Sequence, residues 1–319
     1  MPTLGRLPFD DLARRLRSPV GVVLQTGPFR FRVRSPHALV AEGLHTLYAA
    51  NRVEPDDAFA DFAVLVDHGR ALRRWVRPQA RFVFDGQPVF EPLPADQAYP
   101  LLEWAMNWCI SSHAHEFLVL HAAVVERDSC AMILPAPPGS GKSTLCAALV
   151  HSGWRLLSDE LTLVEPASGL VWPVCRPVSL KNRSIEVIRA FAPQAVFNRV
   201  THDTLKGSVT HMQAPEAHLR LMEVPARPRW IVYPRYAEGA ATRLQPRARA
   251  SAMVDLARNA FNFAALGETG FDTLARLVQA CACLDFEYSR LDEAMALFDL
   301  LARGATAAPA ALPRQTEAV

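Results

Sequence analysis

The pattern of apolar and polar residues predicts two regions along the chain. In the first, residues 29–34 alternate apolar side chains with arginine, which is typical of a strand with one face on a core and one in water. The apolar residues 20–25 precede them across a threonine–glycine turn, so the segment predicts a hairpin. The same pattern predicts a helix at 38–48, strands at 62–66 and 80–84, and a long helix at 95–112. This helix carries Trp104 and Trp108 on one face, and we expect them to pack between regions rather than line a ligand site.

In the second region, short apolar runs alternate with helical patterns. The runs predict strands at 117–125, 131–134, 154–160, 161–165, 229–233 and 283–288, and the helical patterns lie at 145–150, 185–191, 248–263, 267–280 and 292–302. The stretch 192–227 mixes proline with polar residues, which predicts a long functional loop. A proline-rich boundary at 92–94 separates a smaller α+β domain at 1–112, a candidate for partner binding, from an α/β domain at 113–303. The alanine- and proline-rich tail at 304–319 is expected to be disordered.

One stretch of the second region fits the phosphate-binding loop pattern, with alanine in place of the usual first glycine. It consists of Ala136, Pro137, Pro138, Gly139, Ser140, Gly141, Lys142, Ser143 and Thr144. A predicted strand precedes it and a predicted helix follows it, which is the context that the motif needs. The glycines let backbone N–H groups surround an anion at the N-terminus of the new helix. We expect Lys142 to reach the β- and γ-phosphates of a nucleotide and the Ser143 hydroxyl to ligate Mg²⁺.

Two adjacent carboxylates, Asp159 and Glu160, end the predicted strand that follows the loop helix. Beside a phosphate site, one can hold Mg²⁺ and the other can accept the proton of an incoming hydroxyl. The alternative is an exposed acidic turn. His121 lies in the strand at 117–125, which we expect to lie beside the strand that carries the loop. It is either a functional residue next to the phosphate site or a histidine of the core.

Lysine is rare in this chain. Of 34 basic residues, only Lys142, Lys181 and Lys206 are lysines, and the others are arginines. A lysine ammonium is a compact point charge, whereas the arginine guanidinium is a planar fork. The three lysines are therefore candidates for contacts with phosphate. The alternative for Lys181 and Lys206 is that they are surface lysines without a function, which remain by chance in a chain that otherwise uses arginine.

Composition argues against several classes of function. A formal net charge of +2 is too small to suggest nucleic acid or an anionic membrane as a partner. No apolar stretch is long enough to cross a bilayer, and the first residues lack the apolar run of a signal peptide, so we expect a cytoplasmic protein. The six cysteines form no Cys-x-x-Cys pair and are expected to be reduced thiols, with a metal at Cys281 and Cys283 as the weaker alternative.

Taken together, these residues make the chain resemble the HPr kinase/phosphorylase superfamily, and within it the bacterial group called HPr-related kinase A. The superfamily carries a strand histidine, a phosphate loop about fifteen residues later, and a Gly-x-Arg-Leu-x-x-Asp-Asp segment after the loop helix. This chain has His121, the loop at 136–144, and Gly-Trp-Arg-Leu-Leu-Ser-Asp-Glu at 153–160. The closer resemblance, which covers most of the chain, rests on LHAAVV at 120–125, RPVSLKN at 176–182, KGSVTH at 206–211, and RNAFNF at 258–263 with LGE at 266–268.

The resemblance implies the P-loop kinase domain that phosphoenolpyruvate carboxykinase shares, joined to a smaller α+β domain, with ATP and Mg²⁺ as cofactors. It places Asp159 as the general base for an acceptor serine and His121 as a residue that orients this chemistry. Lys142 and Ser143 fall on the nucleotide and metal positions. Glu160 replaces the second aspartate, and the downstream Glu-x-Arg-Gly segment of the bifunctional enzymes is absent. The resemblance therefore does not extend to a phosphorylase activity or to HPr itself as the substrate.

The sequence thus predicts an ATP-dependent kinase that phosphorylates a hydroxyl, a serine by resemblance, on a small protein or peptide encoded nearby. Ser143, Glu160 and Asp159 are the predicted Mg²⁺ ligands, Lys181 is expected to contact phosphate or acceptor, and residues 206–211 to form a mobile acceptor loop. Two alternatives stay open: a small-molecule kinase with the loop at 192–227 as a lid, and a nucleotide-dependent scaffold without phosphoryl transfer. The sequence leaves a homo-oligomer open as well.

Overall fold

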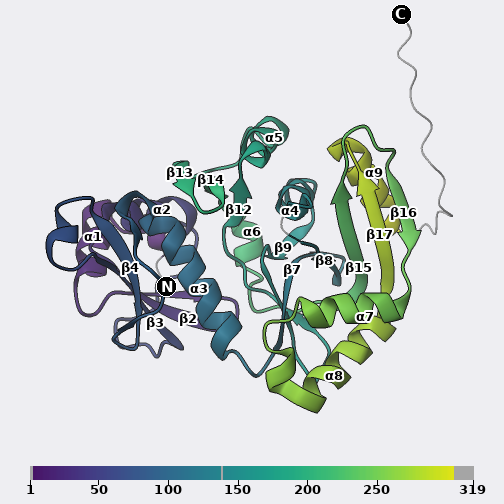
Figure 1. Ribbon diagram of the computed structural model, residues 1–319, viewed down its shortest axis with the longest axis horizontal. Coiled ribbons are helices and arrows are strands. Elements are labelled where there is room, and N and C mark those ends of the chain that lie inside the picture. Colours follow the sequence, from purple (N-terminus) through teal and green to yellow (C-terminus); the bar gives the residue numbers. More distant parts are fainter. Residues whose placement is uncertain (1–2, 138, 305–319) are drawn as a thin grey trace, which may run out of the picture.

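The computed structural model describes residues 3–137 and 139–304, which form a mixed α/β structure with three sheets (Figure 1). The expectations for Pro138 and for a disordered tail at 305–319 lie outside the described residues. Among the described helices, none combines the length and the apolar character that a bilayer span requires.

The first sheet has six strands and belongs to the N-terminal part of the chain. Its order is β1-β2-β3-β4-β5, and β6 pairs with β4. The strands are β1 (Val22–Thr26), β2 (Phe29–Arg34), β3 (Phe62–His68), β4 (Gln79–Phe84), β5 (Gln87–Pro88) and β6 (Leu93–Pro94). The helices are η1 (Leu4–Arg6), α1 (Phe9–Arg17), α2 (Ala38–Leu47), η2 (Ala71–Arg74), η3 (Ala95–Gln97) and α3 (Ala98–His113). The predicted hairpin, the helix α2 and the long helix α3 are confirmed, and every second side chain of β2 is buried as its alternation requires.

The second sheet has eight strands. Its order is β11-β10-β7-β8-β15-β17-β16, and β9 pairs with β7. The strands are β7 (Leu118–Arg127), β8 (Cys130–Pro135), β9 (Arg155–Ser158), β10 (Leu161–Val164), β11 (Val171–Trp172), β15 (Arg227–Tyr236), β16 (Arg243–Pro246) and β17 (Ala282–Tyr288). The parallel neighbours are β8, β15 and β17, whereas β7 runs antiparallel to β8. All the strands predicted for this region are confirmed, and the pattern does not predict the edge strand β16.

Helices cover both faces of the second sheet, so it is the middle of three layers. The helices of this part are α4 (Lys142–His151), α5 (Arg183–Phe191), α6 (Glu216–Leu219), α7 (Arg249–Arg258), α8 (Phe263–Ala280) and α9 (Leu291–Ala302). Successive side chains of β7 point to opposite faces: Ala123 lies in a core with α4 and α9, and Val124 lies in a core with α7 and α8. A strand buried on both faces needs a nearly continuous apolar run, which β7 has.

A third sheet occupies part of the segment for which the sequence predicts a long loop. Its order β12-β14-β13 joins β12 (Val178–Lys181), β14 (Gly207–Met212) and β13 (Thr201–Thr204). The prediction of an irregular loop at 192–227 is therefore wrong for β13, β14 and α6. β14 pairs with the adjacent strand β13 and also with β12, which precedes α5 in the chain, and a local pattern cannot show this second pairing.

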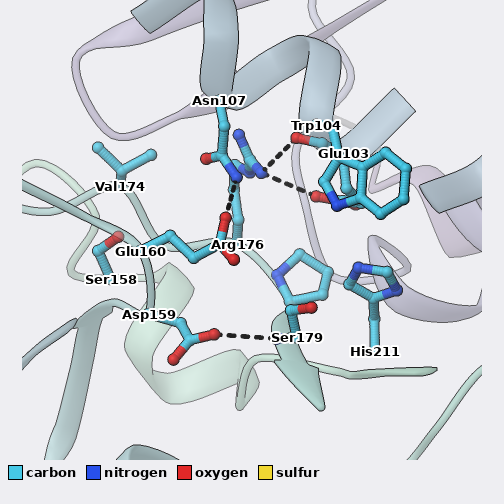
Figure 2. A pocket seen from close by; sticks show the side chains of 11 residues that line it. Glu103, Trp104, Asn107, Ser158, Asp159, Glu160, Val174, Arg176, Ser179 and His211 are labelled. Atoms are coloured by element: carbon cyan, nitrogen blue, oxygen red, sulfur yellow. Dashed lines mark hydrogen bonds and ion pairs between the residues drawn. The ribbon is translucent and has the colours of Figure 1, made fainter. Parts of the chain in front are cut away.

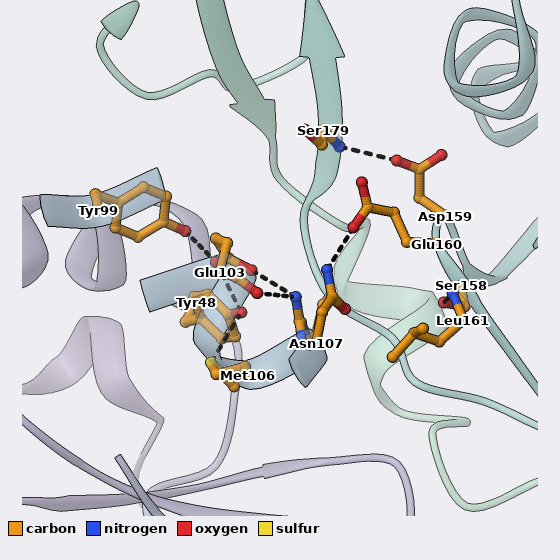
Figure 3. Close-up of polar contacts among 11 residues, drawn as sticks. Tyr48, Tyr99, Glu103, Met106, Asn107, Ser158, Asp159, Glu160, Leu161 and Ser179 are labelled. Carbon is orange, nitrogen blue, oxygen red and sulfur yellow. Dashed lines mark hydrogen bonds and ion pairs between the residues drawn. The ribbon is translucent and has the colours of Figure 1, made fainter. Parts of the chain in front are cut away.

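One buried polar cluster joins the N-terminal part to the second part. Glu103 of α3 accepts hydrogen bonds from Tyr48 Oη at 2.9 Å and from Tyr99 Oη at 2.6 Å (Figure 3). Its Oε2 also forms an ion pair at 2.9 Å with Arg176, which lies between β11 and β12. Side chains of β7 and β10 belong to the same hydrophobic cluster as the N-terminal sheet. The two parts therefore share a continuous core, and α3 lies at their junction.

Removing the Glu103 carboxylate should destabilise this junction strongly. Glu103→Ala leaves the buried Arg176 guanidinium without its ionic partner, and such a loss costs about 3–5 kcal/mol. We expect the free energy of unfolding of Glu103→Ala, measured with denaturant, to be lower than that of the wild type by this amount. Glu216→Ala, which removes an exposed ion pair with Arg220, is the control and should change stability by no more than about 0.5 kcal/mol. Equal stability of Glu103→Ala and the wild type would contradict the role of the cluster.

Candidate active site

Residues 136–144, here called the glycine loop, connect the end of β8 to the start of α4. Gly139 and Gly141 have φ angles of +87° and +88°, a left-handed conformation that side chains with a Cβ atom rarely allow. A Cβ atom at Gly141 would also lie 2.8 Å from Tyr288 Oη. Ala136 is buried and is not among the described residues with a positive φ, so its backbone does not require a glycine. Alanine can therefore replace the usual first glycine of the loop pattern at position 136 without backbone strain.

Two tyrosines hold the glycine loop from the side of the parallel strands. Tyr236 N donates a hydrogen bond to Ser140 O at 3.1 Å, and Tyr288 Oη donates to Gly141 O at 3.3 Å. Helix α4 starts directly after these braced carbonyl groups, at Lys142. The N–H groups of a first helical turn and the helix dipole favour a bound anion. The loop and α4 thus form a suitable cradle for a phosphate group.

All three lysines of the chain line one cleft of about 1320 Å³ beside the glycine loop. Lys142 is 9% exposed and forms no ion pair with any residue that the structure describes. Lys181 Nζ lies 3.8 Å from Glu160 Oε1, and Lys206 Nζ lies 5.2 Å from the centre of the Trp104 ring. Because the three lysines line the same cleft, the alternative of lysines left by chance at scattered surface positions is not favoured. Among the described residues neither Lys142 nor Lys206 forms an ion pair, so the charges of both are left for an anionic ligand.

Asn182 joins the two segments that carry the downstream lysines. Its side chain donates to Lys206 O at 3.3 Å and accepts a hydrogen bond from Ser208 N at 3.0 Å. The prediction of a mobile acceptor loop at 206–211 is wrong for most of its length, because these residues form β14 and pair with both β12 and β13. His211 is only 2% exposed. The lysine of this segment nevertheless reaches the cleft from the turn before β14.

Asp159 follows β9 and lies against the glycine loop. Its Oδ2 accepts a hydrogen bond from Ser143 Oγ at 3.2 Å. The same oxygen accepts a hydrogen bond from Ser179 N at 3.1 Å (Figure 2). Its Oδ1 is buried and has no hydrogen-bond partner among the described residues. Burial raises the pKa of Asp159 to about 6, although the charge of Lys142 opposes the rise. The alternative of an exposed acidic turn is therefore wrong, since Asp159 is a buried carboxylate with one oxygen left for a ligand.

Glu160 turns away from Asp159 towards α3. Its Oε2 accepts a hydrogen bond from Asn107 Nδ2 (Figure 3). Its Oε1 lies 3.8 Å from the Lys181 ammonium. Burial alone would raise the pKa of Glu160, but the charges of Lys181, Lys142 and Lys206 outweigh it and lower the pKa. Neighbouring carboxylates whose pKa values move in opposite directions are a recurrent property of acid–base sites.

The N-terminal part contributes one face of α3 to the cleft, although the sequence indicates no functional residue there. Trp104, Asn107 and Trp108 line the cleft from this face. The Trp108 ring also packs on two phenylalanines of β4. The expectation of packing is therefore right for Trp108, whereas Trp104 lies in the cleft beneath a lysine ammonium. The only sequence signal for Asn107 was its place between two tryptophans on one helix face.

His121 lines the cleft from β7, where it pairs with Leu161 of β10. Burial, assisted by the charge of Lys142, lowers the pKa of His121 to about 4, so its imidazole is neutral at neutral pH. Its backbone N–H donates to Asn259 O at 2.8 Å, and its ring centre lies 5.7 Å from that of Phe261. The position on the cleft favours the functional interpretation over that of a core histidine.

The oxygen atoms of the cleft fit a small hard cation. Ser143 Oγ lies 3.2 Å from Asp159 Oδ2, whereas the Glu160 side chain turns towards Asn107 and Lys181. Mg²⁺ prefers such ligands and usually completes its coordination with phosphates and water. In residues 3–137 and 139–304, no group of three His, Cys, Asp or Glu side chains is placed to hold a metal. Cys281 and Cys283 form no such group either, and both thiols are free.

The raised pKa of Asp159 predicts that its charge costs stability at neutral pH. A carboxyl group with a raised pKa in the folded state stabilises the protein fully below its unfolded pKa, near 3.8, and this contribution is lost as the pH rises through about 6. The shift corresponds to roughly 3 kcal/mol. We therefore expect Asp159→Asn to raise Tm by a few degrees at about pH 7.5 and by less at about pH 5.

Thermal unfolding without nucleotide measures this effect. Asp272→Asn, at an exposed position on α8, is the control and should leave Tm unchanged at both pH values. A lower Tm of Asp159→Asn at pH 7.5, or a gain that does not depend on pH, would contradict the assignment.

Comparisons with known proteins assign no family to the chain. No protein-family model matches it, and no curated protein matches it significantly. The resemblance to the HPr kinase/phosphorylase superfamily therefore stays a prediction that rests on the quoted residues.

Proposed function

We propose that the protein is an ATP- and Mg²⁺-dependent kinase of the HPr kinase type that phosphorylates a hydroxyl, a serine by resemblance, on a small protein or peptide. One observation carries the proposal: Lys142 of the glycine loop forms no ion pair with a described residue and lines the cleft, and the buried Asp159 contacts Ser143, which lines the same cleft. An anion cradle alone would suit any nucleotide-binding protein. A buried carboxylate with a raised pKa beside it adds the base that transfer to a hydroxyl needs.

In this proposal the glycine loop and α4 bind the triphosphate. Lys142 contacts the β- and γ-phosphates, and Lys181 and Lys206 contribute further positive charge from β12 and from the turn before β14. Ser143, Asp159 and Glu160 are the residues that would hold Mg²⁺, which neutralises phosphate charge when it is bound.

Asp159 takes the proton in the transfer step. The acceptor hydroxyl oxygen forms a bond to the γ-phosphorus, the bond from this phosphorus to the β–γ bridging oxygen breaks, and ADP leaves. The hydroxyl proton passes to Asp159, whose Oδ1 has no hydrogen-bond partner among the described residues. With a pKa of about 6, Asp159 is ionised at neutral pH and yet basic enough to accept a proton. The neutral His121 can orient the hydroxyl without adding charge.

The shape of the cleft favours a protein or peptide acceptor over an enclosed small molecule. A small-molecule kinase would need the segment 192–227 as a lid over the site. This segment instead forms β13, β14 and α6, and of its residues only Lys206 lines the cleft. The role of Asp159 separates a kinase from a scaffold that binds nucleotide without transferring phosphate. A kinase needs the Asp159 carboxylate for its function, whereas such a scaffold does not.

Transfer of labelled phosphate from ATP tests the proposal. The acceptors are small proteins and peptides encoded beside the gene, and the variants are wild type, Asp159→Asn and the exposed control Asp272→Asn. We expect Asp159→Asn to bind ATP nearly as well as the wild type and to transfer phosphate about 10²- to 10⁴-fold more slowly, as for loss of a general base. Asp272→Asn should behave as the wild type. A protein that binds ATP but labels no acceptor, or an Asp159→Asn variant of full activity, would refute the kinase.

A further inference from the structure

The cleft continues beyond the glycine loop to an end lined by aromatic side chains. This aromatic end consists of Trp104 and Trp108 of α3, His121 of β7, and Phe261 of the connection between α7 and α8. At about 1320 Å³, the whole cleft exceeds the roughly 300–1,000 Å³ of a site for one small ligand. A nucleotide on the glycine loop therefore leaves room for a second group at the aromatic end.

The aromatic end is continuous with the site carboxylates. On one side, Asn107 lies between the two tryptophans in sequence and donates its hydrogen bond to Glu160. On the other side, Leu161 follows Glu160 directly and pairs with His121, whose ring lies 5.7 Å from that of Phe261. The α7–α8 connection lies against the start of β7, where Ala260 pairs with Leu120 and Phe261 N donates to Val119 O. A group bound between this connection and α3 would lie next to Glu160.

Phe261 lies in the α7–α8 connection, whose backbone and Asn262 side chain are hydrogen-bonded to residues at the start of β7. Its backbone N–H donates to Val119 O at 2.9 Å. The next side chain, Asn262, accepts a hydrogen bond from Val119 N at 3.0 Å and donates to Phe117 O at 2.8 Å. These bonds attach the connection to the start of β7, yet Phe261 itself is 51% exposed. A large apolar side chain fixed half in water at the rim of a cleft is well placed to contact a ligand.

The aromatic end is mostly apolar at neutral pH. Its indole and phenyl groups are uncharged, and burial keeps the His121 imidazole neutral. One charge lies against it, the Lys206 ammonium at 5.2 Å from the centre of the Trp104 ring. An apolar side chain therefore matches this end, whereas a cationic side chain would lose hydration there and be repelled by Lys206. Because Phe261 is half exposed, the end is open to solvent and can admit a segment of a longer chain.

We propose that the aromatic end is the acceptor subsite, and that it selects a peptide segment in which a large apolar side chain stands next to the hydroxyl residue. The inference rests on the proposed function for the role of that hydroxyl. The apolar side chain packs between Phe261 and the tryptophans of α3, and this contact places the neighbouring hydroxyl at the carboxylates. Recognition then depends on the N-terminal part of the chain, which supplies α3.

Short peptides with a single serine test the subsite. In each peptide, one position beside the serine carries Phe, Leu, Ala, Asp or Lys. Two quantities are measured with the full chain: peptide binding, by fluorescence anisotropy with a non-hydrolysable ATP analogue and Mg²⁺, and transfer of labelled phosphate from ATP. We expect peptides with Phe or Leu to bind about tenfold more tightly than the Ala peptide, the Lys peptide to bind more weakly than the Ala peptide, and the Asp peptide to bind more weakly than those with Phe or Leu.

Phe261→Ala is the variant that separates the subsite from the rest of the cleft. We expect it to bind the Phe peptide about tenfold more weakly and the Ala peptide almost unchanged, with the same affinity for ATP. Phe271→Ala is a matched control, because Phe271 is 53% exposed on α8 and does not line the cleft. It should leave all these quantities unchanged.

The two measurements separate the two proposals. Transfer without any preference for an apolar neighbour, or a preference that Phe261→Ala retains, would overturn the subsite and leave the kinase standing. Selective binding of the Phe and Leu peptides without transfer to them or to any other acceptor would support the subsite and count against the kinase. If no peptide binds and none is labelled, the subsite is overturned whatever other acceptor is found.

Discussion

The confinement of opposite charges in one cleft is the constraint on which the rest of this structure depends. Glu160 and three ammonium groups line the cleft, and Asp159 lies buried against Ser143 of the same cleft. Asp159 is buried enough for its pKa to rise to about 6, whereas lysines lower the pKa of Glu160. Lys142 forms no ion pair with a described residue, although its charge acts to lower the pKa of both carboxylates. In this account a bound triphosphate completes the balance, because it supplies the negative charge that the cleft lacks.

Helix α3 makes the N-terminal part a structural component of this site. Its inner side carries Glu103, which holds Arg176 at the junction, and one turn later Asn107 donates to Glu160. The same helix thus fixes the packing of the two parts and orients one of the site carboxylates. We infer that the N-terminal part acts on the reaction through α3, by positioning Glu160 and by lining the acceptor end.

Local features of the sequence predict much of this arrangement. The apolar runs and the glycine loop locate β7, β8 and α4, and the rarity of lysine marks three residues that lie on one cleft. The parts that the sequence misses depend on contacts between distant segments. The pairing of β14 with β12 joins segments on either side of α5, and Asn107 and Phe261 reach the cleft only through the packing of α3 and of the α7–α8 connection. The family resemblance draws attention to the segment that contains Phe261, but no local pattern places Asn107 or Phe261 on the cleft.

Equilibrium binding of ATP tests the central claim most directly, since the whole account requires a triphosphate on the glycine loop. Calorimetric titrations with and without Mg²⁺ would compare the wild type, Lys142→Met and the exposed control Arg220→Met. The account predicts Mg²⁺-dependent binding to the wild type, binding at least about tenfold weaker to Lys142→Met, and no change for Arg220→Met. A wild type that does not bind ATP, or a Lys142→Met variant with wild-type affinity, would contradict it.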